Sequence, residues 1–261
     1  MASDAVLETR GLTMRFGGLT AVKNFSAAIP RGSIVGLIGP NGAGKTTCFN
    51  MITGFYKPSE GQVLFDGADI TGTPPHRVCR SGIARTFQNI RLFGNETVLE
   101  NVMIGCHLRQ KTGWWQAVLC LPSNRREERA IAERSRELLK AVGLQELAGE
   151  KANSLSYGAQ RRLEIARALA TRPAFLLLDE PAAGMNPNET QELMGFIREI
   201  RRSFDLTVLL IEHDMKVVMG ICEHIWVLDY GEMIAAGPPE AIQSDPKVIK
   251  AYLGVEALAH A

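Results

Sequence analysis

The stretch Gly39–Thr47, which reads GPNGAGKTT, combines the residue types that bind phosphate and fits the pattern G-x-x-x-x-G-K-[ST]. Glycines let the backbone bend until successive amide N–H groups point into one concavity, and the positive end of a following helix adds to the attraction for an anion. Lys45 is then placed to reach the β- and γ-phosphates of a nucleotide, and the Thr46 hydroxyl to ligate Mg²⁺.

The surroundings of this loop favour a nucleotide site over a glycine-rich turn with an incidental lysine. Ser33–Ile38 predicts a short buried strand before the loop, and Thr47–Thr53 predicts a helix after it. The residues predicted to contact the nucleotide are Gly39, Pro40, Asn41, Gly42, Ala43, Gly44, Lys45, Thr46 and Thr47.

Two acidic residues follow an apolar run in Leu176–Glu180, which reads LLLDE. The carboxyl edge of a parallel sheet is where open α/β folds hold ligands. At that edge, Asp179 is placed to hold Mg²⁺ through its water shell, and Glu180 to polarise an attacking water. A turn at a strand end is the usual explanation of such a pattern, but its pairing with the phosphate loop favours a catalytic role.

A histidine follows the next apolar run in the same way. His213 comes after Thr207–Ile211 and one further acid, so parallel strands would place it at the same edge as Asp179. Its position favours a functional role over that of an ordinary surface histidine. The other histidines lack this placement and are expected to be structural; they are His76, His107, His224 and His260.

Ser156 and Gly158 lie in the stretch LSYGAQ, directly before the helix-like run Arg161–Ala170. A helix that begins with serine and glycine offers a second anion-binding end. An ordinary helix N-cap explains the same residues, and it is the commoner case.

The strands that position these residues are predicted from continuously apolar runs that alternate with helical stretches. This alternation predicts an α/β fold with a mostly parallel sheet that is covered on both faces. Asn186, Pro187 and Glu189 predict the start of one helix, with an asparagine N-cap, proline first and glutamate third. The expected strands are Val6–Phe16, Phe25–Ile29, Ser33–Ile38, Gln62–Phe65, Ile83–Phe87, Ala174–Leu178, Thr207–Ile211 and Ile225–Leu228.

Between about residues 97 and 158 the pattern changes to helices. Val98–Ile104 predicts one helix, and Arg125–Val142 predicts a longer one that ends before Gly143. The charges of the longer helix are expected to form a solvated face. This block is therefore expected to be a subdomain inserted into the α/β core.

The composition sets outer limits on the function. The chain of 261 residues is 46% hydrophobic, so it can bury one sizeable core, and its net charge of +1 gives no reason to expect nucleic acid as a partner. No apolar run is long enough to span a bilayer, and the N-terminus lacks the pattern of a secretory signal. The five cysteines are scattered, without metal-ligand spacing, so a soluble cytoplasmic protein is expected.

Together these features resemble the ATP-binding subunits of ABC transporters. The phosphate loop, Gln88 after a strand, LSYGAQ before a basic helix, FLLLDE and His213 occur in that family's order and at its usual spacings. The resemblance implies a P-loop NTPase core of the RecA-like type with a small antiparallel β-subdomain. It implies a single ABC ATPase domain over residues 6–254, with its core at about 6–96 and 159–238, a helical subdomain at 97–158, a C-terminal helix at 239–254 and a tail at 255–261.

The resemblance also implies roles for residues at matching positions. Phe16 would stack on adenine, and Gln88 would touch Mg²⁺ or the attacking water. Glu180 would be the general base, and His213 would orient the γ-phosphate. The implied cofactors are ATP and Mg²⁺, and the residues expected at the metal are Thr46, Gln88 and Asp179.

Ser156 and Gly158 would contact the γ-phosphate of ATP held by a second subunit. Because the chain has one phosphate loop and one such signature, two chains would have to pair head to tail. Two departures from the family's pattern bear on that pairing. Tyr157 and Ala159 replace the usual residues of LSGGQ, and Asn186 stands where the family commonly has aspartate, which keeps hydrogen bonding but loses the charge.

Longer stretches are similar to the first of the two ATPase subunits of high-affinity branched-chain amino acid importers. They are MRFGGLTAV, ITGFYKP, RTFQNIRLF, YGAQRRLEIARALA, LDEPAAGMNP, LLIEHDMKVVMGI and AYLG. The implied partners are a related or identical second ATPase, two permease subunits and, indirectly, a periplasmic solute-binding protein. The implied location is peripheral, at the cytoplasmic face of a bacterial inner membrane.

The segment Lys111–Asn124 lies where those proteins also carry extra residues. Its Trp114, Trp115 and Leu119 are expected to pack within the helical subdomain, with contact to the permease or membrane surface as the alternative.

Alternative functions remain open at this point. Within the class, one alternative is an ATPase that serves urea, an amide or another polar solute, and another is an ATPase of lipopolysaccharide export. From other classes, the chain is a soluble ABC-type ATPase of DNA repair or translation, or a P-loop kinase of small molecules. The soluble ATPases usually carry long coiled coils or two ATPase units, and a kinase would lack LSYGAQ and His213. Binding to a permease separates the soluble ATPases and the kinase from the importer, and neighbouring genes for two permeases and a periplasmic binding protein would separate the alternatives within the class.

Overall fold

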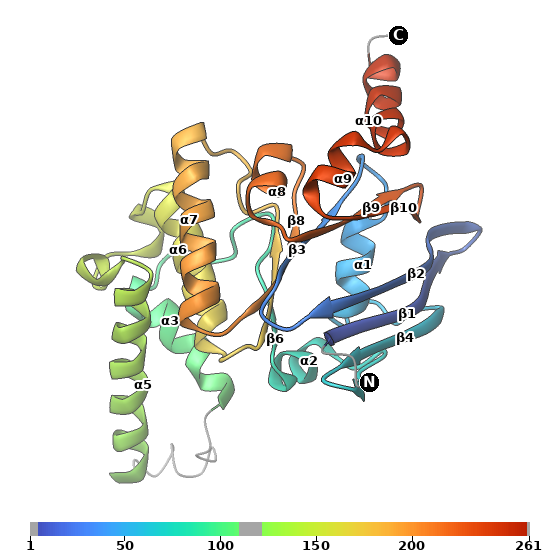
Figure 1. Cartoon of the computed structure of the whole chain (residues 1–261). Coiled ribbons are helices and arrows are strands. Elements are labelled where there is room, and N and C mark those ends of the chain that lie inside the picture. The colour runs from blue at the N-terminus through green and yellow to red at the C-terminus, as the bar shows by residue number, and fades with distance from the viewer. Residues whose placement is uncertain (1–4, 110–121, 260–261) are drawn as a thin grey trace.

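A computed structural model describes residues 5–109 and 122–259 of the chain (Figure 1). Trp114, Trp115 and Leu119 lie outside the described residues, as does His260. The strands are β1 (Ala5–Phe16), β2 (Leu19–Pro30), β3 (Ile34–Ile38), β4 (Glu60–Phe65), β5 (Ala68–Asp69), β6 (Ile83–Arg85), β7 (Phe175–Asp179), β8 (Thr207–Ile211), β9 (His224–Asp229) and β10 (Glu232–Gly237). The α-helices are α1 (Lys45–Ile52), α2 (Pro75–Ser81), α3 (Val98–Cys106), α5 (Pro122–Ala141), α6 (Tyr157–Ala170), α7 (Pro187–Ser203), α8 (Met215–Ile221), α9 (Pro239–Ser244) and α10 (Pro246–Ala259).

The larger sheet has six strands in the order β10-β9-β3-β8-β7-β6. Its neighbours pair in parallel except for β10, which pairs antiparallel with β9. Every residue of β3, β7 and β8 is buried, because both faces of the sheet are covered. The predicted α/β fold with a mostly parallel sheet is therefore confirmed.

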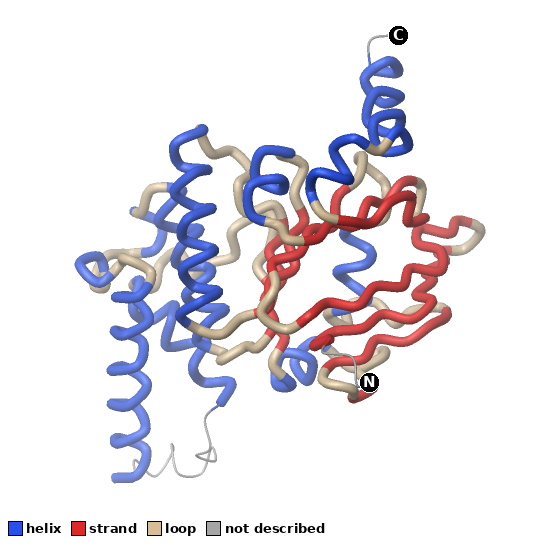
Figure 2. Tube along the Cα trace, in the orientation of Figure 1, coloured by secondary structure: helices blue, strands red, loops and turns tan. Residues whose placement is uncertain are grey.

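The smaller sheet is antiparallel and has the order β2-β1-β4-β5. Figure 2 shows its strands beside the larger sheet, with α1 behind them. One hydrophobic core fills the space between the two sheets and includes Leu12, Phe49, Phe65 and Phe175. This packing holds α1, the helix that follows the phosphate loop, between the sheets.

The helices α3, α5 and α6 pack together to one side of the larger sheet (Figure 1). Val98 and Val102 of α3 share a core cluster with Leu138 and Leu139 of α5 and Leu163 of α6. The same cluster extends to the strands β7 and β8, so the helical region and the sheet form one continuous core. Thr97 begins α3 with a capping box to Glu100, which fixes where the helical region starts.

The element boundaries differ from the sequence-based expectations in several places. β2 begins six residues before the expected Phe25, because its first half pairs with the end of β1. β6 ends at Arg85 rather than Phe87, and the next residue, Thr86, donates its N–H to the Leu177 carbonyl before the chain leaves the sheet.

At the C-terminus, two helices stand where one helix at 239–254 and a tail were expected. α9 ends at Ser244, and α10 begins at Pro246 and continues to Ala259. The residue before a proline is disfavoured in helical conformation, and Asp245 is extended, so the helix is interrupted there. Among the residues that the structure describes, no helix is long and apolar enough to cross a membrane.

Candidate functional site

The phosphate loop joins the buried strand β3 to α1, the arrangement that the sequence predicts. Two of its glycines have backbone angles that other residues rarely adopt, with φ of +150° at Gly39 and +100° at Gly44. There is also no room for a side chain at either position. A Cβ atom would lie 2.1 Å from the Leu228 carbonyl at Gly39 and 2.6 Å from the Ala21 carbonyl at Gly44.

Lys45 occupies the interior of this loop. Its Nζ donates to the carbonyl oxygens of Gly39 and Pro40, at 2.7 and 2.9 Å, and the residue is buried. Burial lowers the pKa of Lys45, and the nearby carboxylates of Glu180 and Asp179 oppose that shift. The ammonium group is thus held where anionic oxygens of a nucleotide would replace backbone carbonyls as its partners.

Strand register brings the acids to the same edge of the sheet as the loop. Leu37 of β3 and Asp179 of β7 both pair with Ile211, the last residue of β8. Parallel strands in this register end together, so Glu180 and His213 lie beside the phosphate loop.

Glu180 is the centre of a polar cluster at this edge. Its Oε2 accepts a hydrogen bond from the Gln88 amide at 2.7 Å and lies 3.6 Å from Nδ1 of His213. Glu180 has a φ of +46°, which is strained for a residue with a side chain, and its N–H donates to the Ile211 carbonyl. Backbone strain of this kind is often found where a side chain must be aimed for chemistry.

Glu212, a residue that the sequence analysis did not single out, is completely buried under this cluster. One of its carboxylate oxygens accepts from the Ala182 N–H at 2.8 Å, and the other accepts from the His213 N–H at 3.2 Å. Burial raises the pKa of Glu212, and these backbone hydrogen bonds oppose the rise. Glu212 therefore joins the loop after β7 to the segment that carries His213.

A buried ion pair on α6 fixes the chain around Gln88. Arg161 donates to the carbonyl oxygens of Phe87 and Gln88 at 2.8 and 2.9 Å and forms an ion pair with Glu164 at 2.8 Å. Glu164 in turn accepts from the N–H groups of Phe87 and Arg91. Both side chains are almost fully buried, so α6 holds the segment that begins at Phe87 through its backbone.

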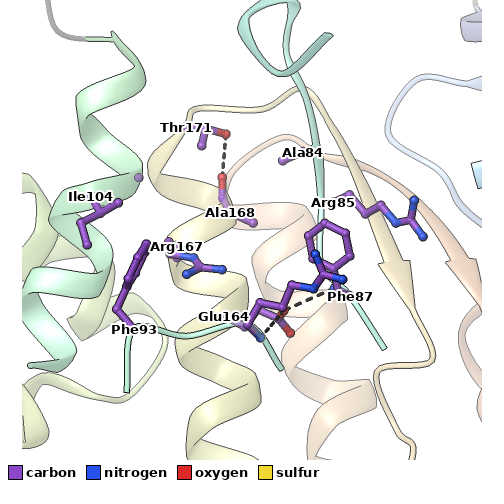
Figure 3. Close-up of a pocket in the computed structure, with 11 residues that line it drawn as sticks. Ala84, Arg85, Phe87, Phe93, Ile104, Glu164, Arg167, Ala168 and Thr171 are labelled. Atoms are coloured by element: carbon purple, nitrogen blue, oxygen red, sulfur yellow. Dashed lines mark hydrogen bonds between the residues drawn. The ribbon is translucent and has the colours of Figure 1, made fainter. Parts of the chain in front are cut away.

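A groove of about 420 Å³ lies between this segment and the helical region (Figure 3). Phe93 and Ile104 form one side, Arg167 and Ala168 of α6 form another, and Phe87 closes the end nearest the sheet edge. Phe93 and Ile104 are both substantially exposed. The groove was not predicted from the sequence, because its walls come from three separate stretches of the chain.

The remaining predicted site residues lie on β1 and at the start of α6 rather than after the strands of the larger sheet. Phe16 is exposed at the end of β1, with its ring against that of Tyr56. Ser156 is the N-cap of α6 and accepts from the Ala159 N–H. Gly158 follows in the first turn of that helix, with open space where a Cβ would stand. Within the described residues, no hydrogen bond joins Ser156 to the chain's own phosphate loop.

The departure at Asn186 has a local structural role. Its side-chain oxygen accepts from the N–H groups of Asn188 and Glu189, and the Glu189 carboxylate accepts from the Asn186 N–H. The predicted capping box at the start of α7 is therefore confirmed. An asparagine serves this cap as well as an aspartate would.

The donor groups at the sheet edge fit a magnesium ion. Thr46 is exposed in the first turn of α1 and offers a hydroxyl, and Asp179 and Gln88 offer a carboxylate and an amide oxygen. Mg²⁺ prefers oxygen ligands and keeps several of its waters, so one or two protein groups plus nucleotide phosphates suffice. All the protein groups in this set are oxygen donors, which suits a hard cation such as Mg²⁺.

The fold and the site define an ATPase of the ATP-binding cassette class. The sequence matches the profile of the family described as "ABC transporter" over residues 22–183, and that of the "Branched-chain amino acid ATP-binding cassette transporter" over residues 232–257. The chain therefore belongs to the ABC transporter family.

Relatives with established names cover almost the whole chain. It is 50% identical to the high-affinity branched-chain amino acid transport ATP-binding protein BraF of Pseudomonas aeruginosa and to the high-affinity branched-chain amino acid transport ATP-binding protein LivG of Escherichia coli, over 97% of this chain and 99% of each relative. The ADP conformation of MJ1267, an ATP-binding cassette of an ABC transporter, superposes with a TM-score of 0.84 at 34% identity, over 96% of this chain and 99% of that one. A dimeric post-hydrolysis state of the cassette MJ0796 bound to ADP and Pi gives 0.73 at 27% identity, over 89% and 98%.

The buried pair on α6 generates a prediction about stability. Replacing Arg161 with alanine leaves the Glu164 carboxylate buried without its ion-pair partner, so Arg161→Ala should lower the free energy of unfolding by about 3–5 kcal/mol. The matched variant Arg162→Ala removes a partly exposed arginine, 3.6 Å from Glu192, and should cost less than about 1 kcal/mol. Urea unfolding of both variants measures the difference.

The pKa of Glu164 also predicts how the destabilisation caused by Arg161→Ala should change with pH. Burial raises the pKa of Glu164 and Arg161 opposes the rise, so removing Arg161 moves that pKa further above its unfolded value. A carboxyl with a raised folded pKa favours the folded state as pH falls, and the deficit of Arg161→Ala should shrink between about pH 8 and about pH 5. A deficit that is constant over this range would contradict the assigned role of Glu164.

Proposed function

We propose that this chain binds ATP and hydrolyses it to energise a bacterial importer of branched-chain amino acids. The observation that carries the proposal is the single sheet edge that gathers the phosphate loop, Asp179, Glu180 and His213, with Gln88 bonded to Glu180. Phosphoryl transfer to water needs groups that position the attacking water and stabilise charge close to the loop that holds the phosphates.

Each residue at the edge has a distinct role in this proposal. Glu180 takes the proton of the attacking water through the oxygen that Gln88 holds, and His213 donates a hydrogen bond to the γ-phosphate. Lys45 leaves the carbonyls of its own loop and pairs with the β- and γ-phosphates. Magnesium, held by Thr46, Asp179 and Gln88, would neutralise charge on the phosphate oxygens.

The second half of each site comes from another ATPase subunit. Ser156 is exposed at the N-terminus of α6, where backbone N–H groups and the helix dipole favour an anion, and it is not bonded to its own phosphate loop. A head-to-tail pair of chains supplies each phosphate loop with the partner's signature. The dimeric state of MJ0796 supports this arrangement by similarity. The partner is identical to this chain or closely related to it.

The groove beside Phe87 is the proposed docking site for the permease. It is lined mainly by apolar and basic side chains, together with Glu164 and Thr171, and its walls belong to both the helical region and the segment that begins at Phe87. An inserted permease segment would therefore contact the element that holds Gln88, so closure of the site and movement of the permease would occur together.

The solute is assigned by similarity. Both BraF and LivG are named for high-affinity branched-chain amino acid transport, and the match over 232–257 belongs to a family described for the same solutes. In such a system two permease subunits and a periplasmic binding protein select the solute, and this chain lies peripherally at the cytoplasmic face of the inner membrane.

The first prediction of this proposal concerns hydrolysis. Glu180→Gln keeps the hydrogen-bonding shape of the side chain and removes the base, so ATP should still bind while turnover falls roughly 10²-fold or more. Binding of a fluorescent ATP analogue and phosphate release measure the two effects on the assembled ATPase pair. Turnover near the wild-type value would remove Glu180 as the base.

The second prediction concerns pairing. Ser156→Arg puts a long charged side chain at an exposed position that, among the described residues, has no hydrogen bond to its own phosphate loop, so ATP binding by the single chain should be unchanged. The same change should block the ATP-dependent dimer, as seen by sedimentation of the Glu180→Gln background with ATP. An unchanged dimer would show that the signature is not part of a shared site.

The third prediction concerns transport. A strain lacking this protein should lose uptake of labelled leucine and keep uptake of labelled urea and amides, and the wild-type gene should restore it. The variant Ile104→Glu places a charge in the groove and should not restore uptake, although its ATPase pair still hydrolyses ATP.

Ile249→Glu is the matched control for Ile104→Glu, because Ile249 is similarly exposed but lies on α10, away from the groove. It should restore leucine uptake. Loss of urea or amide uptake in place of leucine uptake would overturn the assigned solute, and full complementation by Ile104→Glu would overturn the docking site.

A further inference from the structure

Arg85, the last residue of β6, is a charged residue in a buried part of the sheet. Its Nη2 forms an ion pair with Oδ2 of Asp179 at 2.7 Å, and each side chain retains only 8% of its exposure. β6 and β7 are adjacent parallel strands, and Arg85 pairs in register with Leu177. The arginine therefore lies beside the acid that follows the apolar run of β7.

The other terminal nitrogen of the Arg85 guanidinium contacts α1, the helix that follows the phosphate loop. Nη1 of Arg85 donates to the side-chain oxygen of Asn50 at 2.7 Å and lies 3.4 Å from the Thr53 hydroxyl. One guanidinium thus connects three elements, namely β6, the end of β7 and α1. A planar fork with several donors can make such a bridge, whereas the ammonium of lysine is a single point charge.

Aromatic rings complete the enclosure of the guanidinium. Its central carbon lies 5.5 Å from the ring centre of Phe49, 5.9 Å from that of Phe55 and 5.2 Å from that of Phe87. In Figure 3 the Arg85 side chain points away from the groove, and the Phe87 ring stands between them. Arg91 lies 4.3 Å from the centre of the same Phe87 ring.

This enclosure restricts the orientation of Asp179. A buried charged pair is favourable only with good geometry, and here two short polar contacts and three rings fix the arginine. Because Oδ2 of Asp179 is bound to Arg85, Oδ1 is the oxygen left to face the water shell of a metal ion. Groups that orient a metal-binding carboxylate commonly affect metal affinity without touching the metal.

We infer that Arg85 is a positioning residue of the magnesium site, and that its guanidinium holds the Asp179 carboxylate in a fixed place relative to the phosphate-loop helix. The inference rests on the proposed function, which makes Asp179 the acid that binds the water shell of Mg²⁺. It adds Arg85 to the residues of the proposed magnesium site, although the sequence pattern alone indicates only a strand at this position.

The test measures how much Mg²⁺ tightens nucleotide binding. The dissociation constant of a fluorescent ATP analogue is determined for the full-length chain in EDTA and at saturating Mg²⁺, and the ratio of the two values is the metal factor. Arg85→Gln should reduce the metal factor roughly tenfold or more and leave the EDTA value unchanged. Arg85→Lys should reduce it less, because the charge remains and the fork is lost.

Two reference variants make the result specific. Asp179→Asn should remove most of the metal factor, and Arg77→Gln, which changes an exposed arginine on α2, should leave it unchanged. If Asp179→Asn lowers the metal factor but Arg85→Gln leaves it unchanged or raises it, the positioning role is wrong and the proposed function stands. If Asp179→Asn has no effect, the metal role in the proposed function fails instead.

A further variant covers the case in which Arg85→Gln does not fold, as judged by thermal unfolding. Asn50→Ala leaves the ion pair in place and removes the second anchor of the guanidinium. A reduced metal factor in Asn50→Ala supports the inference, and an unchanged one overturns it.

Discussion

The structure of the site depends on the parallel pairing of β3, β8 and β7. Because these strands run in the same direction and in register, the chain leaves each of them at one edge of the sheet, and the three segments that follow carry the phosphate loop, His213 and Glu180. The strands themselves contain almost no polar side chains and are covered on both faces. Polar groups are thus excluded from the interior and concentrated where they can meet a nucleotide.

Buried ionic groups then connect this edge to the rest of the molecule. Arg161 and Glu164 hold the backbone around Gln88 against α6, and Arg85 joins β6 to Asp179 and α1. Glu212 joins the loop after β7 to His213. Burying a charge is costly unless it is paired. Because moving one of these elements would leave a buried charge unpaired, the contacts oppose such movement. The short segment between Arg85 and Arg91 is therefore tied both to the sheet edge and to the helical region.

The sequence was sufficient to predict the fold class, the buried strands and the start of α7, because each depends on local patterns. Continuous apolar runs show burial on both faces, and Asn186 with Glu189 defines a cap without any distant contact. The single helix expected at 239–254 does not allow for the break between α9 and α10, which Pro246 marks. The end of β6 was also misplaced, because the apolar pattern of Ile83–Phe87 does not show where sheet pairing stops.

The buried charges could not be identified from the sequence for a different reason. Arg161 and Glu164 are spaced like an exposed ion pair on a helix surface, and only the packing of Phe87 and Gln88 against α6 makes them interior. Arg85 lies within the predicted strand Ile83–Phe87, and its charge in that short run is the one sequence feature that indicates a role beyond packing. The groove has no local signature at all, since its walls meet only in three dimensions.

A site divided between two chains has an energetic consequence that a complete site would lack. A ligand shifts a conformational equilibrium only by the difference in its affinity for the two states. If the γ-phosphate contacts Lys45 of one chain and Ser156 of the other, ATP binds the closed pair more tightly than the open pair, whereas ADP without that phosphate loses the contact to the second chain. A difference of about 5.5 kcal/mol is enough to move such an equilibrium from one state almost completely to the other. In that arrangement, cleavage of one bond would remove the contacts that hold the pair closed, and the direction of the cycle would follow from which phosphate is lost.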